Sequence, residues 1–281
     1  MKIVVIGATG VLGRNVIPRL QERGHHVRAI VRIEQQAVRL RALGIEAVTG
    51  DILDANSLLS AVAGCEAVLH LATAIPKSGS AADWSLNDRI RREGTRNLLT
   101  AATHANVRRY VQQSIIMLYG DQGQRIMDES TPLQPAPYIQ SAVDMERQVQ
   151  ASALDWSILR GGYFYGPGTD MEESWRDAAR QGNLHLPGDG SGLISLIHVV
   201  DMARAAVLAT ESTLAGSIFN VVDDEPVTYR DLYSYVAAQI GAPPPQPARS
   251  LVRPSLACSN HCLKAQLGWS LAYPTYRAGL V

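Results

Sequence analysis

Short apolar runs alternate with stretches of helical periodicity over the first 160 residues of the chain. A continuous apolar run such as KIVVIG is typical of a strand that is buried on both faces. Strands that alternate with helices form a parallel sheet, because each crossover helix packs back onto it. The pattern therefore predicts an α/β fold with a Rossmann-type doubly wound parallel sheet. Its six expected strands are KIVVIG, HVRAIVR, IEAVTGD, EAVLHLA, RRYVQQS and DWSILR.

The same spacing indicates where the helices lie. One helix is expected from about Val11 to Gly24, where glycine favours a helix end, and Pro18 should bend it. A longer helix is expected over residues 84–105, and another follows Tyr138. These elements predict one Rossmann domain over residues 1–160, to which some later segments return.

The regular alternation ends after residue 160. Loops rich in glycine and proline separate shorter elements, which are a helix over 201–210, the strand SIFNVV, and helices over 229–240 and 260–267. The run GAPPPQPARS predicts an extended linker, because proline-rich segments are stiff. Residues 161–281 are therefore expected to form mainly a smaller C-terminal α/β lobe.

Composition and charge narrow the class of protein. Lys+Arg and Asp+Glu both number 26, so neither a nucleic-acid surface nor an anionic-membrane surface is indicated. No apolar segment reaches the roughly 18 residues that span a membrane, and the N-terminus lacks the layout of a signal peptide. We expect a cytoplasmic protein without nucleic-acid or membrane partners.

The three cysteines, Cys65, Cys258 and Cys262, are too few for a disulfide scaffold and favour a reducing compartment. Cys258 and Cys262 have His261 between them, which resembles part of a metal cluster. No second pair of ligands follows, and metal sites need such a pair. No metal site is therefore expected.

Three glycines, Gly7, Gly10 and Gly13, form a G-x-x-G-x-x-G pattern directly after the first strand. Glycines allow a tight turn and a close approach of the backbone, and the N-terminus of the following helix favours a pyrophosphate. Because the motif joins a strand to a helix, the context is right for a dinucleotide site.

The residues after the second strand indicate which dinucleotide is bound. Arg32 stands where an acidic residue would hold a ribose 2′-hydroxyl, and Arg14 follows the last glycine of the motif. Two guanidinium groups suit a 2′-phosphate, which favours NADP over NAD. The alternative is that both arginines are solvated, and Glu34 is close enough to weaken the preference.

Asp51, in GDILD after the third strand, is a candidate acceptor for the adenine amino group. The alternative role for Asp51 is an N-cap of the next helix, for which Asp54 competes.

Motifs along nearly the whole chain occur in a familiar order. They are GATGVLGR, GDILD, AVLHLA, EGTRNLLTAA, VRRYVQQS, LYG, LRGGYFYGPGT, SLIHVVDMARA, FNVVDDEPVT and LGW. Together they resemble the extended short-chain dehydrogenase/reductase superfamily, the NAD-dependent epimerase/dehydratase group. The resemblance implies a nicotinamide dinucleotide cofactor and a C-terminal lobe that binds the substrate. The residues expected at the dinucleotide are Gly7, Thr9, Gly10, Val11, Leu12, Gly13, Arg14, Arg32, Asp51, Ile52, Leu71, Ala72, Thr73 and Tyr138.

In this family a Ser or Thr holds the reacting group, a Tyr acts as acid or base, and a Lys four residues later lowers the pKa of the Tyr. By resemblance Tyr138 occupies the Tyr position, whereas Ala142 occupies the Lys position. Counted from Gly120 in LYG, the hydroxyl position falls on Ile115, with Ser114 beside it. The chain thus resembles an atypical member with a degenerate Ser-Tyr-Lys set, whose catalytic candidates are Tyr138 and Ser114.

The resemblance implies an NAD(P)-dependent oxidoreductase or epimerase-like enzyme, acting on a small carbonyl, hydroxyl or sugar-nucleotide-like substrate. Two alternatives stay open: a dinucleotide-binding regulator without turnover, and a non-redox isomerase, cyclase or lyase. Arg160, Tyr163, Tyr165 and His198 are candidates for substrate binding, with packing or turn formation as their alternative roles. A monomer or a homodimer is expected.

Overall fold

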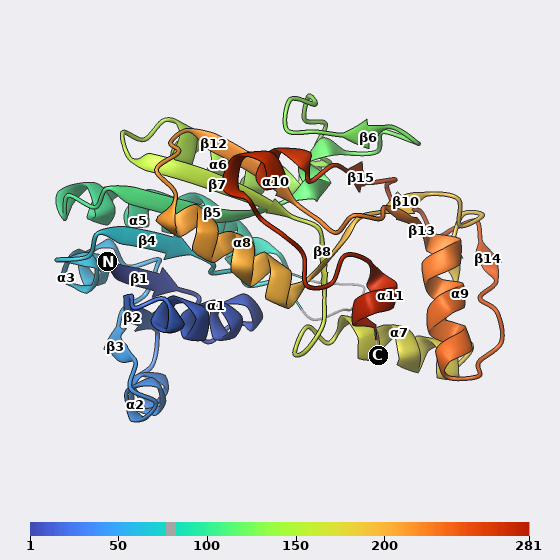
Figure 1. Ribbon diagram of the computed structural model, residues 1–281, viewed down its shortest axis with the longest axis horizontal. Coiled ribbons are helices and arrows are strands. Elements are labelled where there is room, and N and C mark those ends of the chain that lie inside the picture. Colours follow the sequence, from blue (N-terminus) through green and yellow to red (C-terminus); the bar gives the residue numbers. More distant parts are fainter. Residues whose placement is uncertain (77–82, 281) are drawn as a thin grey trace. The chain divides into compact units, whose positions relative to one another are not determined.

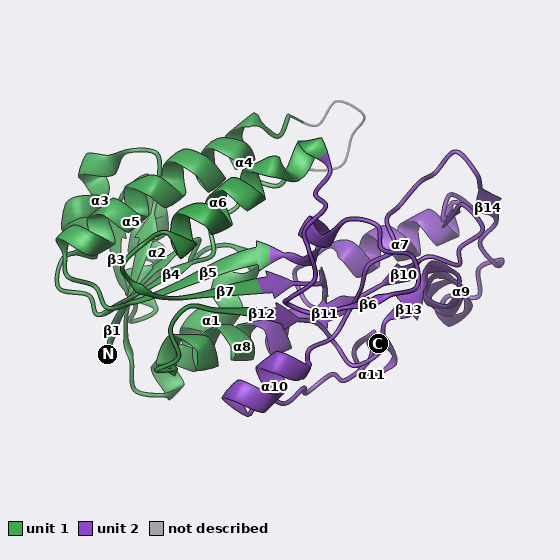
Figure 2. Ribbon diagram, turned by 90° about the horizontal axis from the view of Figure 1, so that it is seen from above, with its two compact units in different colours: residues 1–114, 137–159, 203–218 green, residues 115–136, 160–202, 219–281 purple. Residues whose placement is uncertain are grey.

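The computed structural model describes residues 1–76 and 83–280, which form two compact units (Figure 2). The chain passes between the units several times, so no single boundary near residue 160 separates them. Residues 115–136, expected within the Rossmann domain, belong to the second unit, whereas residues 203–218 return to the first. Unit 1 contains residues 1–114, 137–159 and 203–218, and unit 2 contains residues 115–136, 160–202 and 219–281.

A seven-stranded sheet with the order β12-β7-β5-β4-β1-β2-β3 confirms the Rossmann-type α/β prediction (Figure 1). The strand β1 lies in the interior of the sheet, and it pairs in parallel with β2 and with β4. Ile6 is thereby in register with Ile30 on one side and His70 on the other, so the ends of these strands meet at one edge of the sheet. The strands are β1 (Lys2–Ile6), β2 (His26–Val31), β3 (Glu46–Thr49), β4 (Ala67–His70), β5 (Arg109–Ile115), β7 (Asp155–Gly161) and β12 (Ser217–Val221).

Helices cover both faces of the sheet in unit 1. Figure 2 shows α3, α5 and α6 on one face and α1 and α8 on the other. The long helix expected over residues 84–105 is present but contains a π-helical turn, Ile90–Gly94, between α4 and α5. These helices are α1 (Val11–Glu22), α2 (Glu34–Ala42), α3 (Ala55–Val62), α4 (Ser85–Arg89), α5 (Thr95–His104), α6 (Gln140–Gln150) and α8 (Val199–Glu211).

The apolar face of each helix packs on the sheet because the spacing of its apolar residues matches the helical period. Leu98 and Val149, from α5 and α6, are buried in one cluster with Val4 and Val68 of the sheet. Burial of such side chains contributes roughly 2 kcal/mol each, so this cluster adds substantially to the stability of unit 1.

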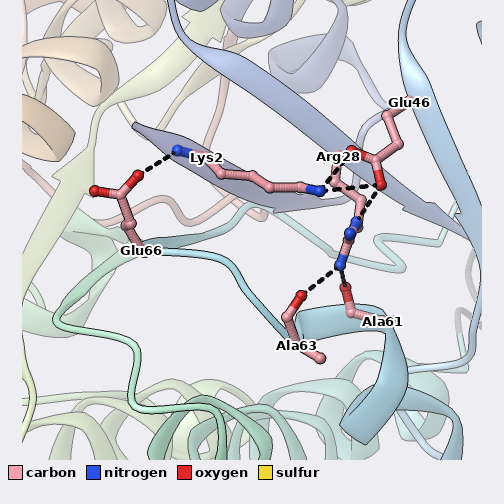
Figure 3. A network of polar contacts seen from close by, with 6 residues as sticks. All are labelled: Lys2, Arg28, Glu46, Ala61, Ala63 and Glu66. Atoms are coloured by element: carbon pink, nitrogen blue, oxygen red, sulfur yellow. Dashed lines mark hydrogen bonds and ion pairs between the residues drawn. The ribbon is translucent and has the colours of Figure 1, made fainter.

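An ionic network joins the beginnings of the strands β1 to β3 (Figure 3). The Lys2 and Arg28 side chains both reach Glu46, with Nζ–Oε2 and Nε–Oε1 distances of 3.0 and 2.7 Å. Burial raises the pKa of Glu46, but the hydrogen bonds from Lys2 and Arg28 outweigh it and hold that pKa below the ordinary value. Arg28 also donates to the carbonyl oxygens of Ala61 and Ala63, which closes the C-terminus of α3.

Unit 2 is built from short elements around its own core. Buried aromatic residues dominate that core, among them Tyr165, Trp175, Tyr229 and Tyr276. Part of the expected extended linker forms β14, which pairs with β9. The elements are β6 (Ile126–Met127), β8 (Tyr163–Tyr165), β9 (Leu186–Pro187), β10 (Leu193–Ile194), β11 (Leu196–His198), β13 (Val227–Thr228), β14 (Pro247–Ala248), β15 (Ala257–Cys258), α7 (Met171–Arg180), α9 (Tyr229–Gln239), α10 (His261–Leu267) and α11 (Tyr276–Gly279).

Three polar side chains lie together inside the sheet of unit 1. The Tyr110 hydroxyl donates to Oε1 of Gln112 at 3.3 Å and lies 3.1 Å from Nδ1 of His70. Because that hydroxyl has only one hydrogen, the tautomer that satisfies both contacts has its hydrogen on Nδ1 of His70. Burial lowers the pKa of His70 to about 4, so the imidazole is neutral at physiological pH.

We expect this histidine to make unit 1 sensitive to acid. Since the folded-state pKa of about 4 lies below the ordinary 6.5, the contribution of His70 is intact above pH 6.5 and falls as the pH drops toward 4. The shift corresponds to roughly 3 kcal/mol of unfolding free energy. Urea unfolding at several pH values should show this loss in the native chain and a flatter profile in His70→Gln. The exposed His26→Gln is the control, and equal slopes for both variants would contradict the assignment.

Candidate dinucleotide-binding site

The turn after β1 requires two of its three glycines. Gly7 has a φ of +87°, and a Cβ there would lie 2.7 Å from backbone atoms of Leu71 and Ala72. A Cβ on Gly13 would lie 2.3 Å from the carbonyl oxygen of Gly7 and 2.6 Å from that of Ala8. No real side chain tolerates such distances, so the turn, the start of α1 and the loop after β4 are in close backbone contact.

The N-terminus of α1 is free to receive an anion. Gly10 is the N-cap residue, and no side chain among the described residues caps the helix. The first turn contains no acidic residue, and Thr9 and Gly10 are exposed. Unpaired amide hydrogens and the helix dipole favour a phosphate group at such a terminus. The cradle formed by the glycines therefore fits a pyrophosphate.

Arg14 and Arg32 are exposed, as a role at the adenosine ribose requires. Within residues 1–76 and 83–280, neither guanidinium has a hydrogen-bond or ion-pair partner. The acidic residue that weakened the cofactor preference, Glu34, forms an ion pair with Arg41 at 2.7 Å. Both arginines therefore remain available to a ligand.

Asp51 and Ile52 lie between β3 and α3, in the loop predicted to face the adenine. Oδ1 of Asp51 accepts a hydrogen bond from the amide of Leu53 at 2.9 Å. The N-cap of α3 is instead Asp54, whose side chain accepts from the amide of Asn56. Asp51 is thus not the cap, and its role at the adenine stays a prediction.

The loop after β4 contains the predicted Leu71, Ala72 and Thr73. The amide of Leu71 donates to the carbonyl oxygen of Ile6, and the next part of the loop is held by buried Asn87, whose Oδ1 accepts from the amide of Ala74 at 3.0 Å. Asn87 was not predicted from the sequence, because an asparagine in a helix gives no signal of its supporting role. Thr73 is exposed between these two anchors.

Tyr138 lies in a single 3₁₀ turn, Pro137–Ile139, directly before α6. Tyr138 is 61% exposed, whereas Ala142, one helical turn later, is fully buried.

Like Asn87, buried Arg91 was not predicted from the sequence. It donates to the hydroxyl of Ser141 at 3.3 Å. Burial lowers the pKa of Arg91, although nearby Asp88 opposes the effect.

Ser114 has a partner within unit 1. Its hydroxyl donates to Oε1 of Glu146 on α6 at 2.6 Å, and the residue is buried. The hydroxyl hydrogen is therefore not available to a substrate in this arrangement. The catalytic role of Ser114 stays a prediction.

The four substrate candidates lie in unit 2, three of them buried. Arg160 donates to the Tyr119 hydroxyl at 2.9 Å, and Tyr165 donates to the carbonyl oxygen of Thr275 at 3.2 Å. Burial raises the pKa of Tyr165 well above its ordinary value. These contacts match the packing alternative more closely than a role in substrate binding, for which burial leaves little access.

His198 and Tyr163 differ in their surroundings. The His198 ring stacks on Tyr273 with centroids 3.7 Å apart, and its Nδ1 accepts from the amide of Val200. Nε2 of neutral His198 therefore carries the hydrogen. Tyr163 is half-buried at the start of β8, and it is the most accessible of the four candidates.

Two further features concern the described residues. The three cysteines are free thiols, and no group of three His, Cys, Asp or Glu side chains in residues 1–76 and 83–280 is arranged to hold a metal. None of the helices in that part of the chain is long and apolar enough to cross a membrane.

The glycine turn, the uncapped helix and the parallel sheet define a nicotinamide-dinucleotide-binding protein of the Rossmann class. The chain belongs to the NAD(P)H-binding family, whose model matches residues 7–185. It is a member of the short-chain dehydrogenase/reductase superfamily, in the NAD-dependent epimerase/dehydratase group, and its relatives support an NAD(P)-dependent enzyme.

Two curated relatives and one solved structure illustrate this membership. The 3-diazoavenalumate denitrifying reductase of a Streptomyces species is 35% identical, over 100% of this chain and 99% of the relative. The 2-alkyl-3-oxoalkanoate reductase of Stenotrophomonas maltophilia is 30% identical, over 86% and 77%. The UDP-glucose 4-epimerase of Thermus thermophilus, solved in complex with NAD, has a TM-score of 0.82 and 26% identity, over 100% and 96%.

Proposed function

We propose that this protein is an NADPH-dependent reductase of an aryl diazonium group, a substrate that needs no proton from the enzyme. The observation that carries the proposal is that the family's hydroxyl and lysine positions hold neither a hydroxyl nor a lysine. By the family resemblance these positions hold Ile115 and Ala142, and the hydroxyl beside Ile115, that of Ser114, donates to Glu146 at 2.6 Å. Similarity to the denitrifying reductase of a diazo compound supports the same substrate class.

The chemistry of a diazonium group explains why these side chains are dispensable. When bound, the reduced nicotinamide supplies a hydride. On the substrate, a nitrogen–hydrogen bond forms at the terminal nitrogen and gives a neutral aryldiazene. That nitrogen–hydrogen bond and the carbon–nitrogen bond then both break, dinitrogen leaves, and the hydrogen forms a new bond to the ring carbon. The positive charge of the diazonium is consumed by the hydride, so no proton is taken up. A ketone, by contrast, becomes an alkoxide that must be stabilised and protonated.

Electrostatics favours the same conclusion. A lysine at position 142 would add a positive charge beside a cationic substrate. Two such charges about 5 Å apart repel by roughly 3 kcal/mol at an effective dielectric constant near 20. Ala142 removes that repulsion, and the chain then retains binding and orientation as its main contributions to the reaction.

NADP(H) is the proposed form of the cofactor. Support comes from the exposed guanidinium groups of Arg14 and Arg32, which have no partner in the part of the chain that the structure describes, and from the ion pair that engages Glu34. A guanidinium group can bind two oxygens of one phosphate at the same time. A ribose hydroxyl has a single oxygen and does not require such a group.

The test follows NADPH absorbance and dinitrogen release with a benzenediazonium salt. The enzyme should release one dinitrogen for each NADPH that is oxidised, above the rate without protein. An NADPH-oxidation rate equal to that without protein would contradict the proposal. Binding of NADPH without turnover of diazonium or carbonyl compounds would instead favour a dinucleotide-dependent regulator.

A second candidate is a ketone reductase with Tyr138 as an unassisted proton donor. Similarity to the 2-alkyl-3-oxoalkanoate reductase favours it, and the exposed Tyr138 has the required hydroxyl. An unassisted phenol has a pKa near 10, so it is a weak base but a usable acid. The two candidates differ in whether Tyr138 must donate a proton to the substrate.

Tyr138→Phe separates the two candidates. For a diazonium substrate we expect less than about a threefold change in kcat, because the overall reaction takes up no proton from Tyr138. For a ketone substrate the loss should be about 100-fold or more, as for other general acids. Tyr235→Phe, in unit 2, is the control for removal of a phenol. A 100-fold loss with the diazonium salt would exclude the proton-independent mechanism.

A further inference from the structure

We infer that Arg41 sets the preference of this protein for NADP over NAD by pairing with the carboxylate of Glu34. The inference rests on the proposed use of NADP and names the residue that would enforce it. Arg41 itself is a positioning residue, which acts on the ligand through Glu34.

The sequence alone places an acidic residue close to the expected 2′-phosphate position. Glu34 is the first residue of α2 and is two residues beyond Arg32. A free carboxylate there could pair with Arg32 and repel a phosphate, or it could accept a hydrogen bond from the 2′-hydroxyl of NAD. Either action would favour NAD.

A residue near the other end of the helix, Arg41, forms an ion pair with this carboxylate. Arg41 lies seven residues after Glu34, so the two Cα atoms are separated by about 10 Å along the axis. Nη1 of Arg41 is 2.7 Å from Oε1 of Glu34, so the glutamate carboxylate is already paired with a cation of its own helix.

A second contact fixes the guanidinium. Nε of Arg41 donates to the carbonyl oxygen of Ala47 in β3 at 2.9 Å. An ion pair between half-exposed side chains is weak when both can move. The bond to Ala47 holds one of the two partners in place, which lowers the entropy cost of the pair. Among the described residues, Arg14 and Arg32 then have no carboxylate partner.

Binding titrations of the full chain with NADP⁺ and NAD⁺ test this role without any turnover. Arg41→Met keeps the aliphatic stem and removes the guanidinium. The ratio of the NADP⁺ and NAD⁺ dissociation constants should shift toward NAD⁺ by about three- to tenfold, the effect of one modest ionic interaction. Arg39→Met, an exposed neighbour on α2, is the matched control for net charge and should leave the ratio unchanged.

The double variant Arg41→Met/Glu34→Gln identifies the cause. If Arg41 acts by holding Glu34, the double variant should regain the native ratio, because no carboxylate is left to release. A double variant that behaves like Arg41→Met would overturn the inference and indicate that Arg41 binds the phosphate directly. An unchanged ratio in Arg41→Met would also overturn it. If the native chain binds neither dinucleotide, the proposed function itself fails, which is a distinct result.

Discussion

Arg109→Met is expected to lower the free energy of unfolding by roughly 3 kcal/mol or more, because it leaves several buried acceptors without a donor. Arg109 is buried in β5 and donates to the carbonyl oxygen of Ala209, near the end of α8, with an Nε–O distance of 2.9 Å. Its remaining hydrogens reach the Ser157 hydroxyl and the carbonyl oxygens of Asp155 and Leu214.

The charge of Arg109 is retained in this environment. Burial lowers the pKa of Arg109 to about 10, while Asp155 acts in the opposite direction. The guanidinium is therefore protonated at neutral pH, and its interaction with the last carbonyl groups of α8 is favoured by the helix dipole. Among the described residues, no carboxylate forms a hydrogen bond with Arg109. Backbone carbonyl groups therefore provide most of the interactions that offset the free-energy cost of burying its charge.

The preceding residue is a matched control. Arg108 is 76% exposed at the side chain and forms an ion pair with Asp155 at 2.9 Å. Since exposed ion pairs contribute about 0–1 kcal/mol, Arg108→Met should shift the urea midpoint only slightly. Similar midpoints for the two variants would show that the buried bonds of Arg109 contribute little net stability.

Gly13→Ala is expected to weaken dinucleotide binding by about 100-fold or more, the largest functional effect that we predict. The added Cβ would lie 2.3 Å from the carbonyl oxygen of Gly7, and no flexible side chain can move aside to admit it. The turn must therefore open, which displaces the amide groups that would bind the pyrophosphate. Fluorescence titration with NADPH measures the change.

The control substitution is Gly192→Ala. A Cβ at Gly192 would lie 3.6 Å from the ring of Tyr229, an ordinary van der Waals distance, so both folding and binding should be unaffected. Thermal unfolding without dinucleotide separates a local change in the turn from global unfolding. Native affinity in a folded Gly13→Ala protein would exclude this turn as the pyrophosphate site.

Much of the fold was predictable because it depends on local patterns. The apolar runs KIVVIG and EAVLHLA predicted strands of a buried parallel sheet, and the parallel pairing of β1 with β4 confirms both. That these two strands are neighbours was not predicted. The glycine spacing predicted the turn that approaches Leu71 and Ala72. Such features repeat with the period of a strand or depend on the small size of one residue, so they can be detected without tertiary contacts.

The π-helical turn and the division of the chain into units were not predictable in this way. The run IRREG has ordinary helical composition, and nothing in it distinguishes a π turn from an α turn. Likewise, residues 115–136 follow a strand of the main sheet, yet their cluster in unit 2 includes Ile116 and Tyr119 with Leu256, far along the chain. Contacts at such separation leave no periodic signal.

Sequence patterns alone predicted the α/β class, the parallel sheet, the glycine turn and a dinucleotide site, because each depends on periodicity, on spacing or on residue size. Only the tertiary structure decided which polar groups are already occupied. It paired Ser114 with Glu146, Glu34 with Arg41, and Arg109 with the end of α8. The physical reason is that a hydroxyl, carboxylate or guanidinium has the same chemistry wherever it occurs in the sequence. Its availability to a ligand depends on which donors and acceptors the fold brings within about 3 Å of it.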